Sequence, residues 1–135
     1  MKKIISIIAA LVIILSLAAC NKDTSDFNAL RDKVEAAGYN VSDAYVDANF
    51  RDVVAAFNVK VYFDKNTIAS IPIVLTKSES AAKANCELFG ENSIKQPIQS
   101  GKIFAYPGKD YPEHILDLVN AIVNGYEIPK NLDAE

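Results

Sequence analysis

One side chain in this sequence could serve as a general base near neutral pH: His114, the single histidine of the chain. Two acids nearby, Asp110 and Asp117, could orient its imidazole in a Ser-His-Asp arrangement. No Gly-x-Ser-x-Gly turn supplies a nucleophile, and one histidine cannot form an HExxH zinc motif. We therefore interpret His114 as a solvated residue in the first turn of a helix.

Other chemical motifs are also missing from the sequence. It contains no phosphate-binding glycine loop, no CxxC pair and no calcium-loop spacing. The acidic residues are scattered over expected polar helix faces and turns, and no two of them form an evident catalytic pair. We expect no catalytic residue, no metal site and no cofactor, and a small hydrolase is the least favoured class.

The segment from Tyr106 to Pro112 could form a recognition surface. It contains two Tyr-Pro pairs around a turn, and tyrosine is enriched in binding surfaces because it joins a large apolar ring to a polar tip. The candidate binding residues are Tyr106, Lys109 and Tyr111, and Lys102 could add charge or stack on a ring. The alternative is a plain connection between a strand and a helix, because a residue before proline disfavours helix.

Cys86 has the spacing of a core residue. Ala82, Cys86 and Phe89 lie at positions i, i+4 and i+7, on one face of an expected helix. A free cysteine often behaves as a small buried hydrophobe. We predict that Cys86 packs in the core, with a reactive exposed thiol as the alternative.

Hydrophobic periodicity predicts the elements that must position these residues. The sequence favours an α+β fold: a small four-stranded, mostly antiparallel sheet with helices packed on one face, in the order α-β-β-β-α-β-α. The expected elements are a helix ending at Gly38 with Thr24 or Ser25 as its cap, strands at 39–46, 58–64 and 68–76, a helix at 79–89 capped by Ser78, a strand at 99–106, and a helix from a cap at Asp110 to Gly125.

Two stretches leave alternatives open. Residues 47–52 are polar, and residues 53–57 fit either a helical turn or the beginning of a longer strand. Pro72 falls within the third expected strand and lacks an N–H. That strand is therefore either an edge strand or begins to pair after the proline.

The N-terminus has the order of a secretory signal. Lys2 and Lys3 precede an apolar run that ends in Leu17-Ala18-Ala19-Cys20. This ending resembles the lipobox of bacterial lipoproteins, and the resemblance covers only these first 20 residues. The apolar run of about 14 residues is shorter than the roughly 20 that a spanning helix needs.

The resemblance implies that Cys20 receives a diacylglyceryl group with palmitate-type chains and becomes the first residue after cleavage. Residues 1–19 would then be a removed signal peptide, residues 20–24 a lipidated cysteine with a short tether, and residues 25–135 one globular α+β domain. The protein is expected on the cell membrane or outer membrane, facing the periplasm or the cell exterior. Two acyl chains on one residue are enough for stable anchoring.

Charge narrows the classes of partner. Removing Lys2 and Lys3 with the signal leaves 12 basic residues against 17 acidic ones, a net charge of −5. This balance argues against nucleic acid, which requires a basic face. The favoured function is a non-catalytic, lipid-anchored domain that binds a protein, a peptide or a cell-wall component. A structural or inhibitory module acting on an external enzyme or toxin is the alternative.

Overall fold

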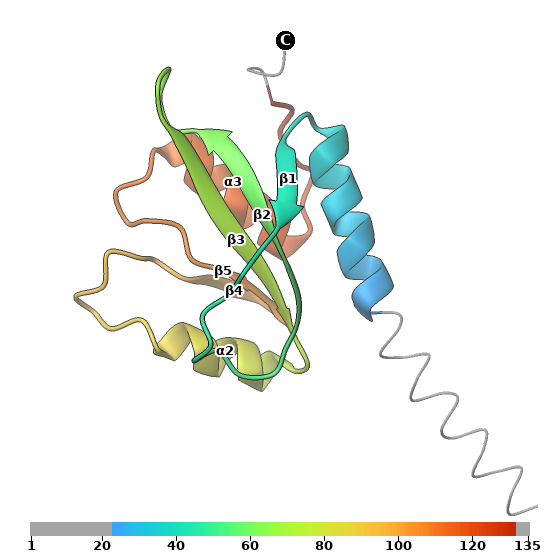
Figure 1. Ribbon diagram of the computed structural model, residues 1–135, viewed down its shortest axis with the longest axis vertical. Helices are drawn as coiled ribbons and strands as arrows, with labels where there is room; N and C mark the ends of the chain where they lie inside the picture. The colour runs from blue at the N-terminus through green and yellow to red at the C-terminus, as the bar shows by residue number, and fades with distance from the viewer. Residues whose placement is uncertain (1–22, 132–135) are drawn as a thin grey trace, which may run out of the picture.

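The computed structural model describes residues 23–131, which form three helices and a five-stranded antiparallel sheet (Figure 1). The predicted signal peptide and Cys20 lie outside the described residues. The elements are a first helix (α1) described over 23–36, β1 (Asn40–Asp43), β2 (Val53–Tyr62), β3 (Ile68–Thr76), α2 (Glu79–Glu87), β4 (Ile98–Ser100), β5 (Ile103–Ala105) and α3 (Glu113–Asn124). The α+β class with an antiparallel sheet is therefore confirmed.

The sheet has the spatial order β1-β2-β3-β5-β4. Its centre is the long β2–β3 hairpin, whose turn is closed by the Phe63 N–H donating to the Thr67 carbonyl oxygen at 2.8 Å. Residues 53–57 open β2, so the longer-strand alternative holds, and residues 44–52 form an irregular connection.

The prediction of four strands is wrong because the expected strand at 99–106 is itself a hairpin. Ser100 pairs with Ile103, and Gly101 takes a φ of 56° between them. A positive φ at the first of two turn residues is the geometry of a type II′ hairpin turn, which favours glycine there. The chain reverses at Gly101, and the element order becomes α-β-β-β-α-β-β-α.

Pro72 sits in a central strand at a position where its missing N–H costs no sheet hydrogen bond. The Thr76 N–H donates to the carbonyl oxygen of Lys102, the residue directly before β5, so N–H groups at alternate residues, including position 72, face the β5 side. β5 pairs only with residues 73–75. Pairing on that side therefore begins just after the proline, as one of the two alternatives predicted.

Two apolar clusters lie on opposite faces of the sheet. α1 and α3 pack on the side chains of one face, and the Phe27 ring contacts that of Phe57 at 5.1 Å. On the other face, Val74 and Phe104 pack against Ala82 of α2 and against the connection before β2. The expectation that all helices share one face is wrong, since α2 covers the face opposite α1 and α3.

The ends of the helices test the predicted caps. Gly38 (φ 97°) and Gly125 (φ 71°) end α1 and α3, and the Ser78 hydroxyl accepts the Ala81 N–H at the start of α2, all as predicted. Asp110 does not cap α3: the cap position is Pro112, without a side-chain bond. A turn closed by the Tyr111 N–H on the Gly108 carbonyl keeps residue 110 outside the helix.

The tether prediction also changes. Asp23 and Thr24 are already helical, so neither Thr24 nor Ser25 is the cap, and the stretch between Cys20 and the fold is shorter than expected. Asp23 forms an ion pair with Lys102 at 2.6 Å, which fixes this turn against the β4–β5 hairpin. No helix within residues 23–131 is long and apolar enough to cross a membrane.

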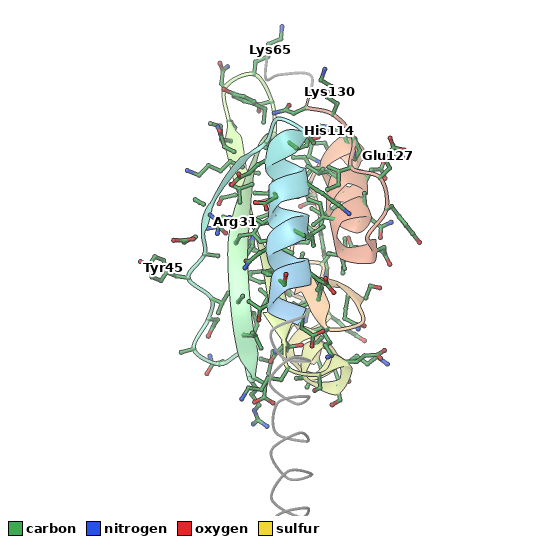
Figure 2. The ribbon with its side chains drawn as sticks, turned by 90° about the vertical axis from the view of Figure 1, so that its right-hand side faces the viewer. Arg31, Tyr45, Lys65, His114, Glu127 and Lys130 are labelled. Atoms are coloured by element: carbon green, nitrogen blue, oxygen red, sulfur yellow. The ribbon has the colours of Figure 1, made fainter. Side chains whose placement is uncertain are left out.

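These contacts place the start of α1 and the start of α2 at the same end of the molecule (Figures 1 and 2). The Lys102 carbonyl accepts the Thr76 N–H at 2.9 Å, and the Lys77 N–H donates to Asp52 at 2.9 Å. We call this end, with Asp23, Asp52, Lys77 and Lys102, the α1-start end. The β2–β3 turn with Lys65 lies at the opposite end.

Candidate functional site

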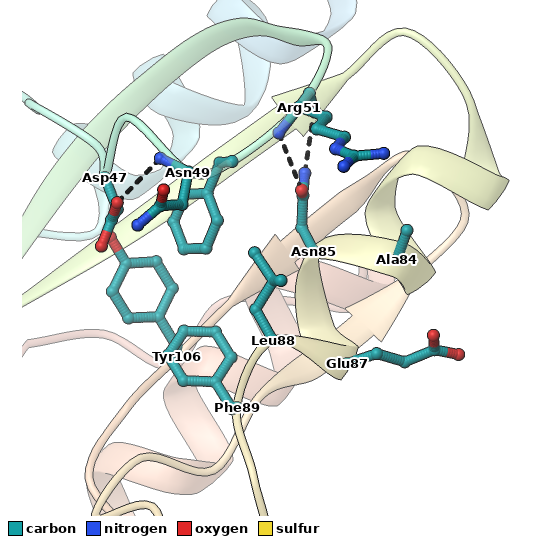
Figure 3. Close-up of a pocket in the computed structure, with 10 residues that line it drawn as sticks. Asp47, Asn49, Arg51, Ala84, Asn85, Glu87, Leu88, Phe89 and Tyr106 are labelled. Carbon is teal, nitrogen blue, oxygen red and sulfur yellow. Dashed lines mark hydrogen bonds between the residues drawn. The ribbon is translucent and has the colours of Figure 1, made fainter.

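An open groove runs between α2 and the connection that precedes β2 (Figure 3). Its volume is about 740 Å³, within the range of small-molecule sites. The connection supplies Asp47, Asn49 and Phe50, and the C-terminal end of α2 with the residues after it supplies Glu87 and Phe89. Tyr106, directly after β5, completes the wall. We call this feature the α2 groove.

Asn85 fixes the shape of the groove. Its side chain is buried (1% exposed), its Nδ2 donates to the Arg51 carbonyl at 3.0 Å, and its Oδ1 accepts the Arg51 N–H at 2.8 Å. The next residue, Asp52, has a φ of 56°, a left-handed conformation that few non-glycine residues adopt. The amide of Asn85 thus holds the two residues directly before β2, Arg51 and the strained Asp52, against α2. We call these two residues the strand entrance.

Three half-buried aromatic rings form the apolar part of the groove. The Phe50 ring contacts that of Tyr106 at 5.4 Å and that of Phe89 at 6.0 Å, and the rings of Phe89 and Tyr106 stack at 5.3 Å. Phe50 also meets the buried ring of Phe104 edge-on at 5.2 Å, which ties the three rings to the core. We call Phe50, Phe89 and Tyr106 the aromatic floor.

The rim of the groove is polar. Asp47 Oδ1 accepts the Asn49 N–H at 2.8 Å, and Figure 3 shows the Tyr106 hydroxyl pointing toward the Asp47 carboxylate. Burial, and then the charge of Asp47, raise the pKa of Tyr106 above its usual value. The phenol therefore keeps its proton at neutral pH and can donate a hydrogen bond.

The three predicted binding residues do not form one surface. Tyr106 belongs to the α2 groove, whereas Tyr111 packs on the opposite apolar cluster, with its ring 5.4 Å from that of Phe63. A Cβ added to Gly108 would lie 2.6 Å from the Tyr111 ring, so the ring covers this glycine closely. Lys109 Nζ donates to the Glu91 carbonyl at 2.7 Å.

Two other predicted roles can be compared with the structure. His114 is exposed in the first turn of α3, as expected, and its Nε2 lies 3.2 Å from the Tyr62 carbonyl oxygen. Lys102, considered as a partner for an aromatic ring, is instead paired with Asp23, and Lys95 lies 5.9 Å from the centre of the Tyr111 ring.

Cys86 is half-buried against the cluster of Val74 and Phe104, so the prediction of a core position holds only in part. Burial, and then the charge of Glu87, raise the pKa of the thiol to about 11. The thiol is therefore almost fully protonated at neutral pH, which disfavours nucleophilic chemistry.

Sequence reasoning missed Phe50, Asn85 and Phe89 as residues of one site. Phe50 lies in a polar stretch that has no periodic pattern, and the spacing of Phe89 from Ala82 and Cys86 predicts a core position for it. Asn85 carried a usable signal, because an amide among buried alanines of one helix face must find hydrogen-bond partners. Its partner, the backbone of Arg51, lies 34 residues away and could not be inferred.

Within residues 23–131, no cluster of three histidine, cysteine or acidic side chains could hold a metal ion. The α2 groove offers an apolar floor, a protonated phenol and carboxylate acceptors, which is a combination suited to binding. No protein-family model, curated protein or solved structure is significantly similar to this chain.

Proposed function

We propose that this chain is a lipid-anchored protein of the bacterial envelope whose domain binds a ligand in the α2 groove and catalyses no reaction. The observation that carries the binding role is the aromatic floor, three half-buried rings open to a groove of about 740 Å³. Partly exposed aromatic rings beside polar groups are typical of recognition sites.

The lipid anchor is proposed from the Leu17-Ala18-Ala19-Cys20 sequence. Only Asn21 and Lys22 separate the proposed lipidated residue from the part of α1 that the structure describes. Two extended residues span roughly 7 Å. The α1-start end, and with it the start of α2, would therefore lie close to the bilayer.

Rigid support for the groove favours binding as its use. The Asn85 amide forms two hydrogen bonds with the Arg51 backbone. The aromatic floor contacts the buried ring of Phe104 through Phe50. A site whose walls are already held in place loses little conformational freedom when a ligand binds. This arrangement supports a preformed binding site.

Site-specific photocrosslinking in the native cells tests this proposal. A photoreactive residue at position 49 reports on the groove rim, and one at position 65 is the matched control, because Asn49 and Lys65 are both exposed loop residues. We expect a product from position 49 that position 65 does not give. Phe89→Ala in the same chain should remove that product.

Equal crosslinking from positions 49 and 65, or a product from position 49 that survives Phe89→Ala, would contradict binding in the groove. The anchor is tested separately, since Cys20→Ser should leave an uncleaved precursor without acyl mass. The two halves of the proposal can therefore fail independently.

A further inference from the structure

We infer that the ligand of the α2 groove is a neutral glycan, whose sugar rings lie on the aromatic floor while their hydroxyl groups bond to the rim. This inference rests on the proposed binding function and specifies the ligand class of the same site. It follows from the packing of the rings, the hydrogen-bonding capacity of the rim, and the charge of the groove.

The packing of the rings excludes a cation held between them. The ring centres of Phe50, Phe89 and Tyr106 lie 5.3–6.0 Å apart, the separation of aromatic rings already in contact. An aromatic cage must instead leave a gap in which a cation meets several ring faces. The floor can therefore only be covered from outside, by a flat apolar surface such as the C–H face of a sugar ring.

The polar groups on the rim of the groove favour a ligand that donates hydrogen bonds. The Asp47 carboxylate only accepts, and the Asn49 amide both accepts and donates. Glu87 also lines the groove, but Figure 3 shows its carboxylate pointing away from Tyr106 and Phe89. Asn85 is not available to a ligand, because its side chain is buried and its amide is bonded to the backbone of Arg51. Hydroxyl groups around a ring can donate to the Asp47 carboxylate and accept from the Tyr106 phenol or the Asn49 amide.

The charge of the groove disfavours an anion. The lining of the groove contains two carboxylates, Asp47 and Glu87, and one guanidinium, that of Arg51, which makes no ion pair within residues 23–131. Figure 3 shows this guanidinium on the far side of Asn85 from Asp47 and Tyr106. A phosphate or uronate placed on the floor would therefore meet the Asp47 carboxylate before any cation.

The size and openness of the groove suit a short chain of rings. A volume of about 740 Å³ lies in the upper part of the range for small-molecule sites. The groove is partly open to solvent rather than enclosed, so a ligand can enter it directly from the surface.

The test is a titration of residues 20–135 carrying Cys20→Ser, in which amide NMR shifts report on binding. The probes are three neutral oligosaccharides (tetra-N-acetylchitotetraose, cellotetraose and mannotetraose), tetragalacturonate, tetralysine, and a neutral peptide mixture. We expect at least one neutral oligosaccharide to shift amides of residues 47–51, 85–89 and 106, with a Kd of about 1 mM. Raising the salt from 50 to 500 mM should change that Kd less than twofold.

Variants assign the binding to the floor and rim. Tyr106→Ala should weaken oligosaccharide binding about tenfold, because it removes a large part of the apolar contact. Tyr62→Ala is the control, since Tyr62 is also partly exposed but lies at the other end of β2, about 30 Å from the strand entrance. If Tyr106→Ala loses its fold, Asp47→Asn and Asn49→Ala carry the test, since both side chains are exposed; each should weaken binding about threefold.

Binding of tetralysine that weakens with salt, or of the neutral peptides, at these same amides would overturn the glycan assignment and leave the groove a binding site of another class. Preference for tetragalacturonate would overturn the charge argument and the assignment with it. No shift with any neutral oligosaccharide at 10 mM would also overturn it, whereas the crosslinking test judges the binding function on its own.

Discussion

Single residues decide where this fold departs from its sequence pattern. Gly101 turns one expected strand into a hairpin, and Asn85 joins α2 to a backbone segment 34 residues away. The first effect had a local signal, because Ser-Gly is a common turn dipeptide. The second had none beyond a polar residue on an apolar helix face. Local chemistry is thus readable from sequence, while its distant partner is not.

Asn85→Ala should lower the free energy of unfolding by about 2 kcal/mol, because it leaves the part-buried Arg51 N–H and carbonyl without their partner. Asn49→Ala is the matched control: its side chain is exposed, so we expect a change below about 0.5 kcal/mol. Urea unfolding of both variants measures the difference. Equal stabilities would show that Asn85 does not hold the strand entrance.

Cys86 should react slowly with iodoacetamide in the native protein. Raising the thiol pKa from 9.0 to about 11 lowers the thiolate fraction at pH 8 about 100-fold. The more basic thiolate is about tenfold more nucleophilic, so roughly a tenfold slower alkylation remains, before any steric protection. The rate in 6 M guanidinium is the reference.

Native and denatured rates of Cys86 that agree within twofold would contradict the half-buried placement. The same pKa shift predicts the direction of a stability change. The unfolded chain loses the thiol proton first, so stability should decline as the pH rises from about 9 to about 11, and Cys86→Ala should remove that part of the decline.

At the scale of elements, periodicity predicted most of the fold. The β2–β3 hairpin, α2 with its Ser78 cap, and the end of α3 at Gly125 follow from alternation and cap residues. The side of the sheet that α2 covers did not follow, because α2 has one apolar stripe and both faces of the sheet offer apolar side chains at its end. The groove, formed by α2 and an irregular connection, was therefore beyond prediction.

The β4–β5 hairpin can be tested through its turn. Gly101→Ala should destabilise the domain by about 1 kcal/mol, because alanine resists a φ of 56° although nothing crowds its Cβ. Gly90→Ala is the control, since it has equal space and no positive φ, and should be neutral or slightly stabilising. Thermal unfolding distinguishes the two. Equal melting temperatures for both variants would argue against the turn.

At the scale of the whole molecule, the ion pair of Asp23 with Lys102 matters because of where it places the groove. It holds the start of α1 beside the β4–β5 turn, at the end of the molecule where α2 begins (Figure 1). With the proposed anchor only a few residues earlier, the start of α2 would lie near the bilayer, and the groove would lie one helix length away, at the C-terminal end of α2. The binding function and the anchor are thus two proposals, each with its own test.

The most direct test of this account is the mass of the N-terminal peptide of the mature protein, purified with detergent from its own cells. We predict that the chain begins at Cys20, that residues 1–19 are absent, and that the peptide carries a diacylglyceryl group with two fatty-acyl chains. A mature chain that retains residues 1–19, or that begins elsewhere with an unmodified Cys20, would contradict the account.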